Sequence, residues 1–199
     1  MKKLPIGIQS IKKILAEDDY IYIDKTAFIK MMLDEGSPHF FMSRPRRFGK
    51  SLFLDTLEEV FKGNKELFKG LKIYQSDYVW KEYPVLHFNF AQIVTTSPEQ
   101  LEISLQEALE DAALSQGIST TGASSQTQLK RLVIELAKKE RVVVLVDEYD
   151  SAIINNLKHP EIAEKNRDIL KDFFGTLKNL DQHLKFCLLY TSPSPRDKA

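Results

Sequence analysis

The sequence predicts an α/β fold in which a mainly parallel β-sheet carries helices on both faces. Residues 142–146 read Val-Val-Val-Leu-Val, an unbroken apolar run that is typical of a central parallel strand covered on both sides. Apolar strand candidates alternate along the chain with amphipathic helix candidates, which favours a parallel sheet. With 199 residues, the chain is long enough for one such domain with its own core.

Composition narrows the class of protein further. Basic and acidic residues number 28 each, so no overall positive field would steer nucleic acid to the molecule. The single cysteine, Cys187, excludes an intrachain disulfide framework, and its apolar neighbours favour a buried, inert thiol. No signal peptide is recognisable near Met1, and no apolar stretch approaches about 18 residues. We therefore expect a soluble, cytoplasmic protein that does not contact a membrane.

The N-terminal elements follow from local patterns. Residues 1–19 predict an extended lead-in and one short helix, and the alternating residues 20–23 predict a short strand. Asp24 or Thr26 would cap a helix that runs to about Leu33. An apolar strand at 40–42, a basic turn and an amphipathic helix then follow one another directly, in the order of a βα unit.

The rest of the chain continues this alternation. Residues 63–84 carry scattered aromatics, and no pattern places basic residues on the same face, so we expect the aromatics to pack over the core instead of stacking on bases. The other predicted elements are a strand at 85–90, a helix capped by Ser97 with Pro98 in its first turn, a loop at 116–125, a helix around 129–136, a strand at 141–146, a loop, a helix at 162–180 and a strand at 184–189.

The basic turn after the first apolar strand has the layout of a phosphate-binding loop. A helix N-terminus offers unpaired N–H groups and a partial positive charge to an anion. Gly49 would let the backbone approach phosphate, Lys50 would reach the β- and γ-phosphates, and the Ser51 hydroxyl would ligate Mg²⁺. The usual G-x-x-x-x-G-K-[ST] pattern has its first glycine where Arg44 stands here, so the strand–loop–helix context carries the prediction.

A second motif ends the apolar run at 142–146. Asp147 at the strand tip would hold Mg²⁺ through its water shell, and Glu148 would orient and deprotonate a water molecule. Right-handed crossovers place the carboxyl ends of parallel strands at one edge of the sheet. We therefore predict that the two motifs come from neighbouring strands and share one triphosphate. Asp150 would either support the metal shell or cap the next segment.

On these residues the chain resembles the bacterial AAA-ATPase-like family, whose members often carry a C-terminal PD-(D/E)xK nuclease-like domain. The similar stretches, within a resemblance over roughly residues 1–189, are Leu4-Pro5-Ile6-Gly7, Tyr22-Ile23-Asp24-Lys25-Thr26, Arg44-Pro45-Arg46-Arg47-Phe48-Gly49-Lys50-Ser51-Leu52 and Val144-Leu145-Val146-Asp147-Glu148-Tyr149-Asp150. The resemblance implies a three-layer P-loop NTPase fold with ATP and Mg²⁺ as ligands.

The resemblance also implies roles for single residues. Lys50 and Glu148 would be catalytic, and Ser51 and Asp147 would hold the metal. The nucleotide-binding positions implied in this way are Arg46, Arg47, Phe48, Gly49, Lys50, Ser51 and Leu52. Two questions stay open: Arg46 and Arg47 face the phosphates or pair with surface acids, and Asp24 and Lys25 approach the base or ribose or form only a structural turn.

We expect an ATPase that hydrolyses ATP with Mg²⁺ and a water activated at Glu148. The alternative is a nucleotide-binding switch or interaction module without significant turnover. A nucleic-acid-directed ATPase is suggested only by the nuclease-like domain of family members. A homo-oligomer or a partner protein remains open, and no base-reading motif separates ATP from GTP.

The C-terminal residues depart from the family pattern. Residues 190–199 contain two prolines and few apolar residues, which predicts that they do not continue a sheet. We expect a P-loop domain over 1–190 that is incomplete at its C-terminus, and a disordered, foreign or frameshifted tail at 191–199. A lid, a polar sensor residue and a nuclease domain would then be missing.

Overall fold

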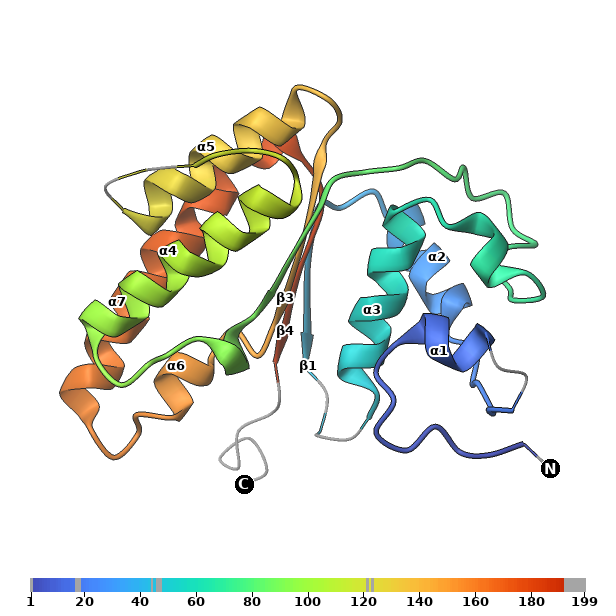
Figure 1. Ribbon diagram of the computed structural model, residues 1–199, viewed down its shortest axis with the longest axis horizontal. Coiled ribbons are helices and arrows are strands. Elements are labelled where there is room, and N and C mark those ends of the chain that lie inside the picture. Colours follow the sequence, from blue (N-terminus) through green and yellow to red (C-terminus); the bar gives the residue numbers. More distant parts are fainter. Residues whose placement is uncertain are drawn as a thin grey trace.

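A computed structural model describes residues 2–16, 19–43, 45, 48–120, 122 and 124–191. Its centre is a four-stranded, all-parallel sheet with the order β1-β4-β3-β2, which confirms the predicted α/β class. Figure 1 views this sheet edge-on, between two groups of helices. The strands are β1 (His39–Ser43), β2 (Val85–Asn89), β3 (Val142–Asp147) and β4 (Leu184–Thr191).

The register of the sheet brings the strand ends to one edge. Asp147 at the end of β3 pairs with Tyr190 of β4, and Ser43 at the end of β1 pairs with Thr191. All four strands therefore finish at the lower edge of the sheet in Figure 1. The prediction that β1 and β3 are neighbours is wrong, because β4 lies between them. The two motifs nevertheless follow strands that end at the same edge.

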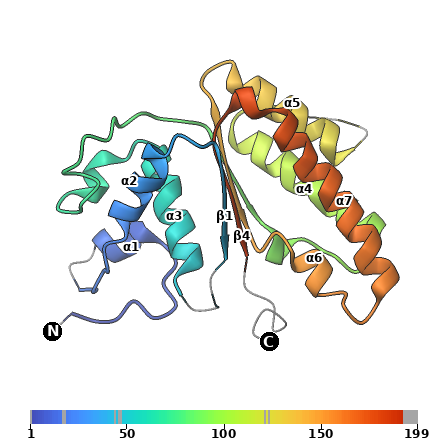
Figure 2. The same cartoon turned by 180° about the vertical axis from the view of Figure 1, so that it is seen from behind.

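Helices cover both faces of the sheet, as Figures 1 and 2 show from opposite sides. One face carries α4 (Pro98–Ser115), α5 (Ser125–Ala137), α6 (Ser151–Ile154) and α7 (Pro160–Asn179). The other carries α1 (Ile11–Ala16), α2 (Thr26–Asp34) and α3 (Lys50–Phe61). Short 3₁₀ turns join the larger elements: η1 (Lys65–Phe68), η2 (Phe90–Gln92) and η3 (Asp181–His183).

Strand β3 contributes side chains to both hydrophobic cores, one on each face of the sheet. Val144 and Val146 face the core under α4, α5 and α7, whereas Val143 and Leu145 face the core under α3. All six residues of β3 are buried. Burying a valine or leucine side chain stabilises the fold by about 1.5–3 kcal/mol, and a one-residue slip would exchange the two faces. This alternation fixes the register that delivers Asp147 to the edge of the sheet.

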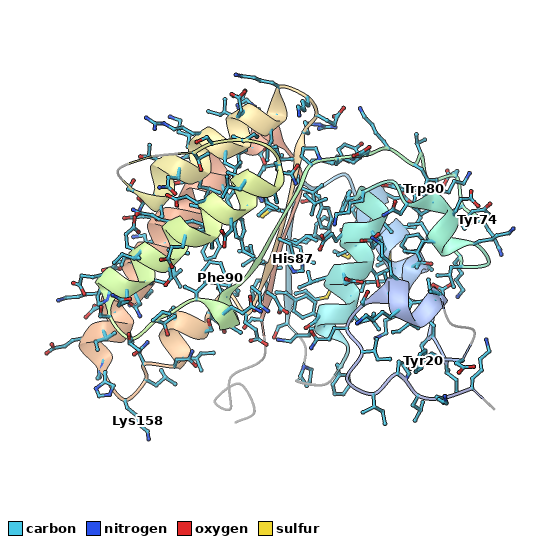
Figure 3. All side chains as sticks on the ribbon, viewed as in Figure 1. Tyr20, Tyr74, Trp80, His87, Phe90 and Lys158 are labelled. Carbon is cyan, nitrogen blue, oxygen red and sulfur yellow. The ribbon has the colours of Figure 1, made fainter. Side chains whose placement is uncertain are left out.

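Other predicted features are confirmed. Phe68 and Ile73 from the 63–84 segment are fully buried against α3, and Figure 3 shows Trp80 and Tyr74 on that side of the molecule. The Ser97 hydroxyl caps α4 by accepting a hydrogen bond from the Gln100 N–H at 3.3 Å. Burial raises the pKa of the Cys187 thiol to about 12, as expected for an inert cysteine.

Three local predictions need correction. Residues 20–23 form no strand beyond a single bridge between Lys3 and Tyr20, because the backbone of this segment pairs only locally with Lys3 and not with the four-stranded sheet. The loop after β3 contains the short helix α6. Strand β4 runs to Thr191, two residues beyond its predicted end, because Tyr190 pairs with both β1 and β3, Thr191 pairs with Ser43 of β1, and both residues are buried.

The rest of the predicted tail, residues 192–199, lies outside the described residues. Within the part of the chain that is described, no helix combines the length and the apolar character needed to cross a bilayer.

Candidate functional site

The first motif is built at the start of α3. Gly49 is the residue that precedes the helix, and its φ of 74° lies in the left-handed region that favours glycine. The Gly49 carbonyl accepts the first helical hydrogen bond, from the Phe53 N–H at 3.0 Å. Lys50 and Ser51 thus occupy the first turn of α3, where the helix N-terminus favours negative charge. Lys50 is 8% exposed, so its ammonium is held at this edge of the sheet.

The second motif meets the first at this edge. The Ser51 hydroxyl donates a hydrogen bond to Asp147 Oδ2 at 3.2 Å, although the two residues are 96 positions apart. Lys50 Nζ lies 3.9 Å from Asp147 Oδ1 and forms a direct ion pair with Glu148 Oε1. The structure therefore brings Lys50, Ser51, Asp147 and Glu148 into one cluster.

Glu148 has an unusual backbone. Its φ of 53° makes it the one non-glycine residue with a positive φ among those described. Such a conformation costs about 1–3 kcal/mol and persists only where the surroundings enforce it. Here the Glu148 carbonyl accepts the Ser151 N–H at 2.9 Å, at the start of α6. The strained turn directs the chain from the end of β3 into α6 while the Glu148 carboxylate reaches Lys50.

The electrostatics of Asp147 favour a cation beside it. Burial raises the pKa of Asp147, the Lys50 ammonium lowers it, Glu148 raises it again, and the net pKa is above the ordinary value. Asp147 Oδ1 is buried and has no hydrogen-bond partner among the described residues. The same is true of Asp150 Oδ1, three residues further on. Mg²⁺ prefers hydroxyl and carboxylate oxygens, so Ser51 and Asp147 fit that ion.

Residues 5–191 match the family described as Predicted AAA-ATPase. The chain belongs to this family. A relative named "Uncharacterized protein in vnfD 5'region", from Azotobacter chroococcum mcd 1, is 44% identical over 190 residues, which is 94% of this chain. The matched region is 37% of that relative's length, so the chain spans well under half of it. No solved structure matches the chain.

Two residues of this AAA-ATPase-family chain were missed by sequence reasoning. Tyr190 and Thr191, assigned to a tail, form the tip of β4 between the two motifs. The Tyr190 ring centroid lies 5.6 Å from Lys50 Nζ, and its carbonyl accepts the Tyr149 N–H at 3.4 Å. An aromatic face attracts an ammonium, so Tyr190 helps to hold Lys50 in place. The signal was the strand propensity of Tyr and Thr directly after a run of apolar residues.

The structure describes only some of the remaining predicted positions of the two motifs. Arg46 and Arg47, together with Arg44, lie outside the described residues. Phe48 is 61% exposed, and its carbonyl accepts a hydrogen bond from Lys25 Nζ at 3.4 Å. Asp150 is the N-cap residue of α6, and its carbonyl accepts the Ile154 N–H at 3.0 Å, but its side chain makes no capping hydrogen bond.

Proposed function

We propose that this chain binds ATP with Mg²⁺ and hydrolyses the terminal phosphoanhydride bond. The contact between Ser51 and Asp147 carries this proposal, because it joins a phosphate-binding turn to a buried acid at one point. The description of the family, Predicted AAA-ATPase, supports ATP as the ligand.

Each residue of the cluster has a distinct role in binding. The N–H groups at the start of α3 and the Lys50 ammonium would bind the phosphate oxygens, as anions prefer helix N-termini. Ser51 and Asp147 would hold Mg²⁺ through their oxygens. When bound, the ion supplies neutralisation of charge on the phosphoryl oxygens.

The ion pair between Lys50 and Glu148 links binding to chemistry. A triphosphate competes with the Glu148 carboxylate for the Lys50 ammonium, since both are anions that need the same N–H donors. Once displaced from Lys50, the Glu148 carboxylate can accept a hydrogen bond from a water molecule. Nucleotide binding thereby creates the general base that the reaction requires.

The reaction itself is then a displacement at phosphorus. Glu148 accepts a proton from a water molecule, and the water oxygen bonds to the γ-phosphorus. The bond between the γ-phosphorus and the β–γ bridging oxygen breaks, and ADP leaves with that electron pair. Lys50 stabilises the negative charge that builds on the phosphoryl oxygens in the transition state.

Phosphate release by the full chain tests this proposal. We expect release that depends on Mg²⁺ and falls by at least about 100-fold in Lys50→Ala and Glu148→Gln. Glu164→Gln is the matched control, because Glu164 is an exposed glutamate on α7. Equal release from the parent and both variants would refute hydrolysis at this site.

Parallel titrations of ATP and GTP identify the nucleotide. ATP binding that is lost in Lys50→Ala but accompanied by no release from the parent would instead select the alternative, a nucleotide-binding module without turnover.

A further inference from the structure

The turn before α2 is clamped from both sides. Asp24 Oδ1 accepts hydrogen bonds from the Thr26 N–H at 2.8 Å and the Thr26 hydroxyl at 2.6 Å. Asp24 Oδ2 accepts the Lys72 N–H at 2.8 Å, and the buried Thr26 hydroxyl accepts the Ile73 N–H at 3.1 Å. Burial raises the pKa of Asp24, but these bonds outweigh it and the pKa is lowered overall. These hydrogen bonds give Asp24 a structural role in the turn. They do not involve the side chain of Lys25.

Lys25 points from this fixed turn to the phosphate-binding loop. Its Nζ donates to the Phe48 carbonyl at 3.4 Å, and it would lie 3.6 Å from a Cβ added at Gly49. Among the described residues, no carboxylate lies within ion-pair distance of Lys25. A long hydrogen bond to one carbonyl uses only one of the three donors of an ammonium. Lys25 therefore has donors available beside the turn where phosphate would bind.

The charge of a bound triphosphate favours more than one cation at this site. A triphosphate carries several negative charges, and Asp147 and Glu148 add theirs, so a lysine ammonium beside the turn is favoured in addition to Lys50. Arg44, Arg46 and Arg47 of the same turn lie outside the described residues. Lys25 reaches the loop from the turn before α2, whereas Lys50 reaches it from the first turn of α3.

We propose that Lys25 is a nucleotide-binding residue whose ammonium contacts the phosphates beside Gly49. This inference rests on the proposed ATP site and adds a residue outside both motifs.

Affinity measurements on three variants separate a charge contact from a brace on the loop. Lys25→Gln keeps an N–H donor for the Phe48 carbonyl but removes the charge, whereas Lys25→Arg keeps both. We expect ATP affinity by calorimetry to fall about tenfold in Lys25→Gln and to stay near the parent in Lys25→Arg. The salt dependence of ATP affinity should also weaken in Lys25→Gln. Lys69→Gln, at an exposed lysine in the 63–84 segment, is the control.

Chemical labelling of the parent gives a second readout that does not depend on any variant folding. An ATP acyl phosphate transfers its acyl group to a nearby lysine amine: the amide bond forms, the acyl–phosphate bond breaks and ATP leaves. We expect mass spectrometry to find labelled Lys25 and Lys50, both suppressed by excess Mg²⁺ and ATP, and no such suppression at Lys69.

The outcomes distinguish this inference from the proposed function. Unchanged ATP affinity in Lys25→Gln, or labelling of Lys50 without Lys25, would overturn the role of Lys25 and leave the ATP site intact. Equal losses in Lys25→Gln and Lys25→Arg would also overturn it, since charge would not then matter. A folded parent that binds no ATP would end both proposals together.

Discussion

The two helical layers of this molecule bury polar groups of different kinds. The α3 layer buries charged side chains: Lys50 and Glu59 are 8% and 4% exposed, and Asp147 at the adjoining strand end is 4% exposed. The α4–α7 layer buries neutral groups, among them Asn156 and Asn166. A charged group is costly to bury unless it is paired, whereas the buried Nδ2 groups of Asn156 and Asn166 donate to backbone carbonyls. Under the proposed function, the binding chemistry would lie on the α3 side and the α4–α7 side would serve as scaffold.

The neutral network shows how the scaffold supports the site. Asn156 and Asn166 both donate from Nδ2 to the Thr95 carbonyl, at 2.7 and 3.0 Å, and to the Ala152 carbonyl, at 3.0 and 3.1 Å. The Ser151 hydroxyl donates to the Phe90 carbonyl at 2.8 Å. These bonds fix α6, the element that follows the strained Glu148, against the segment after β2. Figure 3 shows Phe90 on this side of the sheet.

The largest expected effect comes from changing a charge on the α3 side. Asp147→Asn keeps the shape but removes the anionic ligand, so we expect phosphate release to fall at least about 100-fold. Stability should change little or rise, because burial already disfavours the charged form of Asp147. Release assays and thermal unfolding on the same samples measure both quantities. A large loss of stability would mean that Asp147 has a structural role. It would contradict the proposed difference between the two helical layers.

The opposite pattern is expected on the scaffold side. Asn166 is fully buried, and Asn166→Ala removes two hydrogen bonds and leaves a small cavity, which should cost about 2 kcal/mol of unfolding free energy. Denaturant unfolding measures this cost, and Asn155→Ala, at a neighbouring exposed asparagine, is the control. ATP affinity below the unfolding transition should stay near that of the parent. Loss of ATP binding in a folded Asn166→Ala variant would contradict the assignment of binding to the α3 side and of scaffold to the α4–α7 side.

Two left-handed glycines test the same division within the backbone. Gly49 and Gly117 have φ values of 74° and 69°, so alanine at either should cost about 1 kcal/mol of stability. Gly49 belongs to the turn that would face the phosphates, whereas Gly117 follows α4 on the opposite face of the sheet. We expect only Gly49→Ala to weaken ATP binding in titrations. Similar losses of affinity in both variants would show that backbone strain acts on the site from a distance.

Much of this arrangement could be predicted from local patterns, because the determinants are close together in sequence. The apolar run of β3 predicts a strand buried on both faces, and Gly49-Lys50-Ser51 predicts a tight turn at a helix start, which the structure builds with a left-handed Gly49. The roles of Lys50, Ser51, Asp147 and Glu148 in catalysis and metal binding remain predictions, although the four side chains do meet.

What escaped prediction depends on distant parts of the chain. The order of strands in a sheet is a non-local property, so nothing near β1 indicates that β4 separates it from β3. Tyr190 looked like part of a polar tail, since its burial comes from β3 and from Lys50 rather than from its own neighbours. The positive φ of Glu148 likewise depends on the turn into α6, and no single residue in the sequence predicts that turn.

The smallest expected effect concerns a charged pair on the α3 side away from the site. Glu58 accepts a hydrogen bond from His87 Nδ1 at 2.8 Å and pairs with Lys62; Figure 3 shows His87 beside the sheet. Burial raises the pKa of Glu58, but His87 and Lys62 outweigh it and lower the pKa to about 2 from its ordinary 4.5. The carboxylate is therefore more stable in the folded chain. Its contribution is complete above pH 4.5 and disappears as the pH falls toward 2.

Glu58→Gln measures that contribution directly. Above pH 5 the variant should be less stable than the parent by about 1 kcal/mol, a value reduced by solvent screening, and the difference should shrink as the medium is acidified. Urea unfolding at a series of pH values gives this difference, with Glu164→Gln as the exposed control. ATP affinity at neutral pH should not change, because the Glu58 side chain bonds to His87 and Lys62, which belong to neither motif. A stability difference between parent and variant that grows on acidification would contradict the lowered pKa of Glu58. It would mean that charges on the α3 side affect stability through repulsion instead of pairing.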